Sequence, residues 1–199
     1  MFKFLSLMFF TIGLLSPLSQ SHAHGPVKAL IVSCVDYRLV TDDVPDFAKI
    51  LGLTEKTDLL TIPGASLGAT LSPDKADPHH MHDLEAAFNQ TFEFMKTAHN
   101  FEEVYVIDHR DCGMYKKIYG DKYAKERYDE TKQHAENMKK FREKMKTAFP
   151  DKTVRFFLMD IVPAGQPIKY DEIKFKNDNE IDVVTTAWSD QPAQTLTLP

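Results

Sequence analysis

Two short segments of the chain carry residue types that bind soft metal ions. The first is Cys34 with Asp36 and Arg38 at alternate positions after it, and the second is His109 with Cys112 three residues later. Two thiolates and one imidazole suit zinc, which takes sulfur and nitrogen ligands in tetrahedral sets. Three protein ligands leave a fourth position open, as in a catalytic zinc site. We therefore expect Zn2+ to be bound by Cys34, His109 and Cys112.

The N-terminal segment allows a second interpretation of the same two cysteines. Lys3 is followed by an apolar run over residues 4–15 and by Ser-His-Ala at residues 21–23. This order predicts a signal peptide over residues 1–23, with residues 24–199 forming one exported domain, periplasmic or secreted. Exported proteins commonly pair their cysteines, so a disulfide remains an alternative to zinc ligation.

Composition and charge narrow the class of protein. The chain has 199 residues, of which 43% are hydrophobic and 27% are charged, which is typical of one globular domain. Its net charge of -5 supplies no broad surface for neutralising phosphates, so nucleic acid is not an expected partner. The apolar run near the N-terminus is shorter than the roughly 20 residues that span a bilayer, and we expect no membrane span in the mature chain.

Apolar segments alternate with amphipathic ones along the rest of the chain. Strands are predicted over residues 27–33, 58–62, 103–108 and 154–159, and helices over residues 44–51, 83–98 and 121–149. Two later segments, residues 168–175 and 181–187, are predicted as short edge strands or a hairpin. The expected inward-facing residues of the last helix are Tyr128, Ala135, Met138, Phe141 and Met145.

This alternation predicts an α/β fold with a mostly parallel central sheet flanked by helices. Cys34 follows the first predicted strand and His109 follows the third. Sites in such sheets form at the carboxyl ends of the strands, so both residues should reach the same edge.

The two segments together resemble the β-class carbonic anhydrase family. Cys-x-Asp-x-Arg and His-x-x-Cys lie roughly seventy residues apart, each after a strand, and the match covers about residues 27–115. The resemblance implies a β-carbonic-anhydrase-like fold and a carbonate dehydratase, in which zinc-bound hydroxide reversibly hydrates carbon dioxide to bicarbonate. It also implies Asp36 and Arg38 as the catalytic dyad, and a homo-oligomer, either a dimer or a dimer of dimers.

Several interpretations of single residues stay open. Asp36 could accept a hydrogen bond from zinc-bound hydroxide, could coordinate zinc itself, or could form only a structural ion pair with Arg38. Asp111 could orient His109 or cap the following helix, and we favour the cap. For the histidines of one loop we favour solvent exposure over a second metal site or a proton shuttle; these are His79, His80 and His82.

The loop Pro63-Gly64-Ala65-Ser66 departs from the family, whose members usually carry an Asn-containing or Gly-Gly sequence there. This difference leaves two other functions open. One is hydrolysis of carbonyl sulfide or carbon disulfide at the same site. The other is a non-catalytic zinc-binding protein of the same fold.

Overall fold

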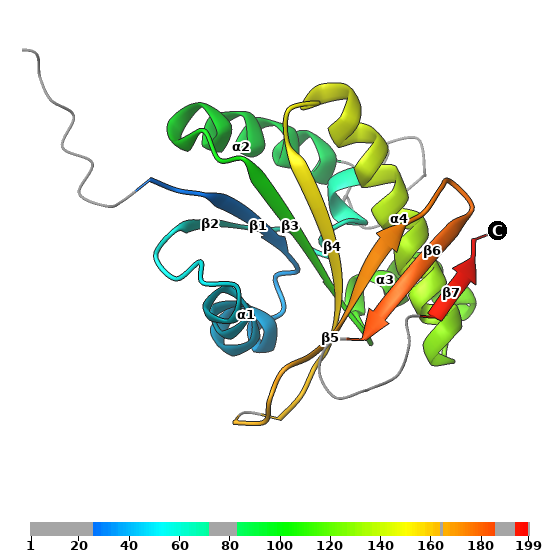
Figure 1. The fold of residues 1–199 in the computed structure, drawn as a ribbon. Coiled ribbons are helices and arrows are strands. Elements are labelled where there is room, and N and C mark those ends of the chain that lie inside the picture. The colour runs from blue at the N-terminus through cyan, green and yellow to red at the C-terminus, as the bar shows by residue number, and fades with distance from the viewer. Residues whose placement is uncertain (1–25, 72–82, 164, 186–193, 199) are drawn as a thin grey trace, which may run out of the picture.

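One seven-stranded sheet organises the part of the chain described by the computed structural model, which comprises residues 26–71, 83–163, 165–185 and 194–198 (Figure 1). The strand order is β2-β1-β3-β4-β5-β6-β7. The strands are β1 (Ala29–Ser33), β2 (Thr57–Thr61), β3 (Glu103–His109), β4 (Thr153–Asp160), β5 (Lys169–Phe175), β6 (Glu180–Thr185) and β7 (Gln194–Thr197).

The sheet has a parallel part and an antiparallel part. Strands β2, β1, β3 and β4 pair in parallel, whereas β5, β6 and β7 add to β4 as antiparallel neighbours. The α/β fold is therefore confirmed, and the parallel strands form the half that carries the predicted metal ligands. The two later segments form a hairpin, β5–β6, which was one of the two alternatives. The short strand β7 was not expected.

Helices cover both faces of the sheet (Figure 1). They are α1 (Val44–Ile50), α2 (Leu84–His99), α3 (Gly113–Tyr119) and α4 (Arg127–Ala148). Three shorter helical turns are Leu39–Asp43, Gly68–Thr70 and Gly120–Lys122. The helix expected over residues 121–149 begins only at Arg127, and a separate helix, α3, precedes it. Within the described residues, no helix has the length and apolar character needed to cross a membrane.

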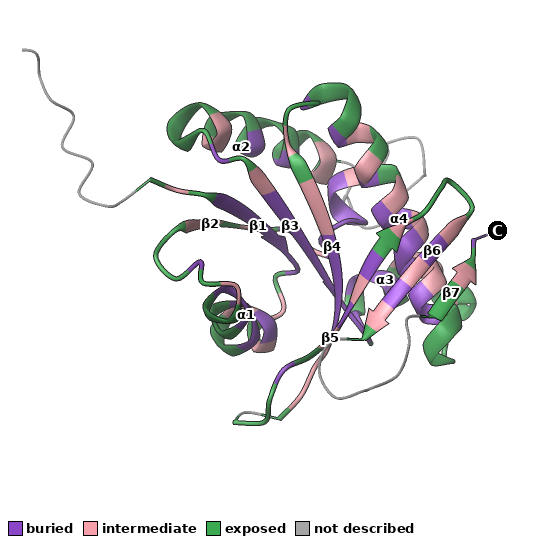
Figure 2. Cartoon of the chain, viewed as in Figure 1, coloured by how far each residue is buried: buried purple, intermediate pink, exposed green. Residues whose placement is uncertain are grey.

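Two apolar cores lie on opposite faces of the sheet, because successive strand residues point to opposite sides. Leu30 of β1 packs in the same core as Phe88 of α2, whereas its neighbour Ile31 packs in the same core as Phe47 of α1. The central strands are buried along most of their length, and the helices expose their outer faces (Figure 2). This burial makes the sheet a rigid support for the loops at its edge.

The expected inward face of α4 is correct except at its first turn. Ala135, Met138, Phe141 and Met145 are buried, but Tyr128 is 50% exposed, so its prediction was wrong. The inward positions near the start of α4 are polar instead, and they are Glu130, Thr131 and His134. These residues form hydrogen bonds to the end of β3, where an apolar side chain would leave polar groups without partners.

Candidate metal centre

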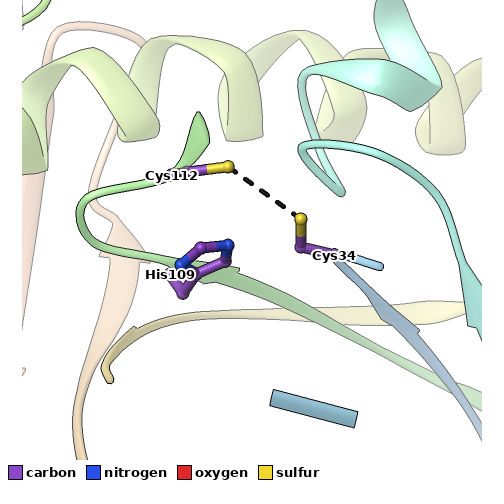
Figure 3. A group of neighbouring side chains, drawn as sticks. All are labelled: Cys34, His109 and Cys112. Carbon is purple, nitrogen blue, oxygen red and sulfur yellow. Dashed lines mark hydrogen bonds between the residues drawn. The ribbon is translucent and has the colours of Figure 1, made fainter. Parts of the chain in front are cut away.

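The three predicted metal ligands meet at one edge of the sheet. Cys34 follows β1 directly, His109 is the last residue of β3, and Cys112 precedes the first residue of α3. Because β1 and β3 are adjacent and parallel, their carboxyl ends lie side by side. One ligand atom from each residue lies within 4.8 Å of the other two, and all three residues are buried (Figure 3). This group could hold a metal ion.

The hydrogen bonding of His109 leaves one ring nitrogen free for a metal. Nδ1 lies 2.9 Å from the carbonyl oxygen of Arg110, which can only accept, so Nδ1 carries the proton. In the neutral imidazole Nε2 then carries the lone pair, and this atom is buried with no hydrogen-bond partner among the described residues. A buried imidazole nitrogen with a free lone pair is costly unless something binds it. A metal ion fits this atom, and the backbone hydrogen bond fixes the ring.

The two cysteines are free thiols in this structure, with their Sγ atoms 3.9 Å apart, compared with about 2.05 Å in a disulfide. The disulfide alternative therefore does not describe this conformation. The hydrogen bond from Cys112 lowers the pKa of Cys34 to about 4, and the backbone N–H of Gly64 also donates to Cys34 Sγ, at 3.3 Å. The same hydrogen bond raises the pKa of Cys112, because Cys112 is its donor, and burial of the thiol and the nearby charge of Cys34 raise it further.

Asp36 and Arg38 form a bidentate ion pair beside the three candidate ligands. Arg38 donates from Nε to Oδ1 at 2.9 Å and from Nη2 to Oδ2 at 2.7 Å, and its backbone N–H also reaches Oδ1, at 3.0 Å. The side-chain hydrogen bond from Arg38 lowers the pKa of Asp36 to about 2. Asp36 is therefore an oriented carboxylate with its oxygens engaged by Arg38.

A pocket of about 240 Å³ opens onto the three ligands. Its other lining residues are Val35, Asp36, Pro63, Gly113, Met114 and Lys117. Apolar side chains, one carboxylate and one lysine thus surround the three candidate ligand atoms, in a space large enough for a small molecule.

The loop after β2 passes close to the ligands because two glycines allow it. Gly64 has φ of +76°, and a Cβ there would lie 2.8 Å from Cγ of Met114. Gly68 approaches the backbone even more closely, because a Cβ there would lie 2.2 Å from the carbonyl oxygen of Pro63. The tight turn places the Gly64 N–H on Cys34 Sγ, so the loop at residues 63–66 forms part of the candidate site.

A buried polar network around Asp108 of β3 holds the same loop in place. Asp108, the residue before His109, accepts hydrogen bonds from the backbone N–H of Ser66 at 2.9 Å and from its Oγ at 2.7 Å. Tyr115 donates its hydroxyl to Asp108 at 2.7 Å, and Nδ1 of His134 lies 2.9 Å from the same carboxylate. Sequence reasoning missed this network. Its one available signal was an Asp inside an otherwise apolar strand, where an unpaired carboxylate would be too costly.

A second polar cluster fixes the backbone after His109. The guanidinium of Arg110 lies 2.6 Å from Asp171 of β5 and 3.1 Å from Asp160 of β4. Glu130 of α4 accepts from the backbone N–H of Asp111 at 2.7 Å. The turn between His109 and Cys112 is therefore held from the sheet on one side and from α4 on the other, and sequence reasoning missed these residues too.

Asp111 does not have the role that we favoured. It adopts φ of +58°, lies on the surface and forms an ion pair with Lys116. No side chain caps the N-terminus of α3, so the predicted cap was wrong. His109 is oriented by the Arg110 carbonyl instead. The predicted signal peptide and the three loop histidines, His79, His80 and His82, lie outside the described residues.

Comparison with known proteins identifies relatives without an assigned activity. No family model matches the chain. Solved structures with some likeness to it include the β-carbonic anhydrase CcaA, at 12% identity and a TM-score of 0.45 over 74% of this chain and 75% of that chain. The β-carbonic anhydrase CafA of Aspergillus fumigatus gives 15% identity and a TM-score of 0.37 over 72% and 79%. These values are too low to support an inference about activity.

The sequence relatives are more similar. An uncharacterized protein of Rickettsia bellii is 34% identical over 134 residues, which cover 67% of this chain and 77% of the relative. An uncharacterized protein of Rickettsia conorii is 35% identical over 134 residues, which cover 67% of this chain and 68% of the relative. The chain belongs to the same family as these two uncharacterized rickettsial proteins.

Proposed function

We propose that this chain is a zinc-dependent carbonic anhydrase that converts carbon dioxide and water reversibly to bicarbonate and a proton. The observation that carries the proposal is the convergence of two groups on one pocket. The first group is Cys34, His109 and Cys112, and the second is Asp36 with Arg38. Two thiolates and one imidazole would favour zinc, and a set of three protein ligands would leave one coordination position for water. The resemblance of both sequence motifs to β-class carbonic anhydrases supports the same conclusion.

The residues of the pocket suit the chemistry of this reaction. Bound zinc supplies a Lewis acid that lowers the pKa of water from 15.7 to about 7, so a nucleophile is available at neutral pH. Asp36 cannot rotate freely, because Arg38 binds both of its oxygens, and it can accept a hydrogen bond from that nucleophile and orient it. Val35, Pro63 and Met114 provide apolar walls for carbon dioxide, which carries no charge.

The decisive experiment measures metal content and hydration on the same samples. The zinc-loaded protein should hydrate carbon dioxide in a stopped-flow assay, and His109→Ala should lose both zinc and activity. Asp36→Asn should keep zinc but lose activity by about 100-fold or more, which is the usual size of a lost proton-handling group. Asp46→Asn, the same change on the exposed surface of α1, is the matched control and should keep both.

Three substrates on one sample separate this proposal from its alternatives. Carbon dioxide, carbonyl sulfide and carbon disulfide are compared at equal zinc occupancy. A preference for a sulfur substrate would replace the proposed reaction by a hydrolase at the same site. Zinc binding with no turnover of any of the three would mark a non-catalytic zinc protein, and full hydration without zinc would refute the proposal outright.

The predicted export, its periplasmic or extracellular destination and the homo-oligomer remain proposals. Mass spectrometry of the protein isolated from its native cell would show whether residues 1–23 have been removed. Sedimentation of the purified protein would give its oligomeric state.

A further inference from the structure

One cationic side chain in the lining of the candidate metal pocket, Lys117, takes no part in metal binding or in the Asp36–Arg38 pair. Lys117 shares the lining with Gly113 and Met114, the first residues of α3. In an α-helix, residues i and i+4 lie on one face, and side chains lean toward the N-terminus. Lys117 therefore lies one helical turn after Gly113, and its side chain leans back toward the N-terminal end of α3, next to Cys112.

The neighbouring cations are paired, whereas Lys117 has no ion-pair partner in the part of the chain that the structure describes. Arg38 is bound to Asp36, and Lys116 forms an ion pair with Asp111. Within the described ranges, no carboxylate forms an ion pair with Lys117. Its positive charge at the pocket is thus not cancelled by a protein anion there.

The other charges at the pocket balance one another and leave the positive charge of Lys117 uncompensated. Two thiolates from Cys34 and Cys112 would neutralise a divalent metal ion, and Asp36 neutralises Arg38. Lys117 is then the remaining net charge on the lining. An anion that enters the pocket meets one unbalanced positive charge, whereas a neutral molecule of the same size gains nothing from it.

We propose that Lys117 makes the mouth of the metal pocket a subsite for small monovalent anions of the bicarbonate type. The inference rests on the proposed function, in which a neutral substrate becomes a singly charged product at this site. Lys117 is a positioning residue in this account, because it attracts and orients the anion while the metal ligands and Asp36 surround the reacting atoms. An arginine at this position should serve equally, whereas a neutral side chain should not.

The test measures anion affinity without depending on turnover. The full chain is loaded with cobalt(II), whose visible absorption changes when a ligand occupies the open position, and is titrated with azide. Lys117→Gln is expected to weaken azide binding by about fivefold, the effect of one unit charge about 4 Å away even in bulk water. Lys116→Gln removes the same charge from the adjacent residue and should leave the affinity unchanged. Lys117→Arg should bind azide as the unsubstituted protein does.

A neutral ligand separates the charge effect from a disturbed metal site. Imidazole should bind the cobalt protein with equal affinity in the unsubstituted chain and in Lys117→Gln. Equal losses for azide and imidazole, or equal losses for the Lys116 and Lys117 variants, would overturn the subsite. A chain that binds no cobalt would overturn both the metal site and the subsite. Loss of azide binding in Lys117→Gln alone, in a protein that does not hydrate carbon dioxide, would support the subsite and refute only the proposed reaction.

Discussion

The substitution Ser66→Ala removes one buried hydroxyl and tests whether the polar network around Asp108, next to the candidate metal centre, stabilises the fold. Ser66 Oγ donates to the carboxylate of Asp108 at 2.7 Å and lies 3.1 Å from the hydroxyl of Tyr115, and Ser66 is fully buried. Hydrogen bonds to charged groups contribute about 1.5–3 kcal/mol to stability. Asp108 keeps three other donors, so we expect a loss near the middle of this range, about 2 kcal/mol.

The matched control is Ser33→Ala, which removes another fully buried serine hydroxyl. Ser33 Oγ donates only to the neutral carbonyl of Cys34, at the longer distance of 3.3 Å. A neutral hydrogen bond contributes about 0.5–1.5 kcal/mol, and this one should fall at the lower end of that range. The two variants therefore differ in the charge and proximity of the acceptor, while the atom removed is the same.

Urea unfolding of the metal-free protein, monitored by circular dichroism in the presence of EDTA, gives the free energy of unfolding of each variant. We expect Ser66→Ala to be less stable than Ser33→Ala by about 1 kcal/mol or more. The rate at which EDTA removes metal should also rise in Ser66→Ala, because Ser66 holds the loop whose Gly64 N–H contacts Cys34. Equal stability of the two variants would refute the reasoning.

Two further predictions concern the backbone and the pH dependence of stability. In urea unfolding, Gly64→Ala should be less stable than Gly52→Ala by about 1–3 kcal/mol. Both glycines have positive φ, but only a Cβ at Gly64 would clash with a side chain, that of Met114. Equal losses of stability in the two variants would mean that Met114 moves aside. Burial, followed by the charges of Asp42 and Asp46, raises the pKa of Asp43 to about 6, so the folded state keeps a proton that the unfolded chain releases near pH 4. Stability should therefore fall as pH rises from about 4 to 6, and the gain in stability from Asp43→Asn should be about 2 kcal/mol larger at pH 8 than at pH 4.5. The exposed control Asp121→Asn should show no such trend, and a pH-independent gain in Asp43→Asn would contradict the proposed cause.

The sequence by itself determined the α/β class and the meeting of the three candidate metal ligands. Strand-length apolar segments alternating with amphipathic helices left few arrangements other than a sheet with helices on both faces. Cys34 directly follows one strand and His109 ends another, and parallel neighbouring strands bring their ends to one edge. The adjacency of Asp36 and Arg38 was likewise local, because two residues in alternate positions after one strand need no tertiary contact to pair.

The tertiary structure decided the features that depend on contacts between distant segments. The approach of Gly64 to Cys34 and Met114 joins three separate parts of the chain, and no local pattern encodes it. The hydrogen bonds from Ser66 and His134 to Asp108 have the same origin.

The errors in the predictions have the same physical reason. Tyr128 fits the apolar spacing of its helix but is exposed, because the start of α4 packs against polar groups at the end of β3. Asp111 stands where a helix cap is common, yet its left-handed backbone directs it to Lys116 instead. The spacing of residues along a helix predicts which of them share a face. Which part of the protein that face contacts depends on the three-dimensional packing of distant segments.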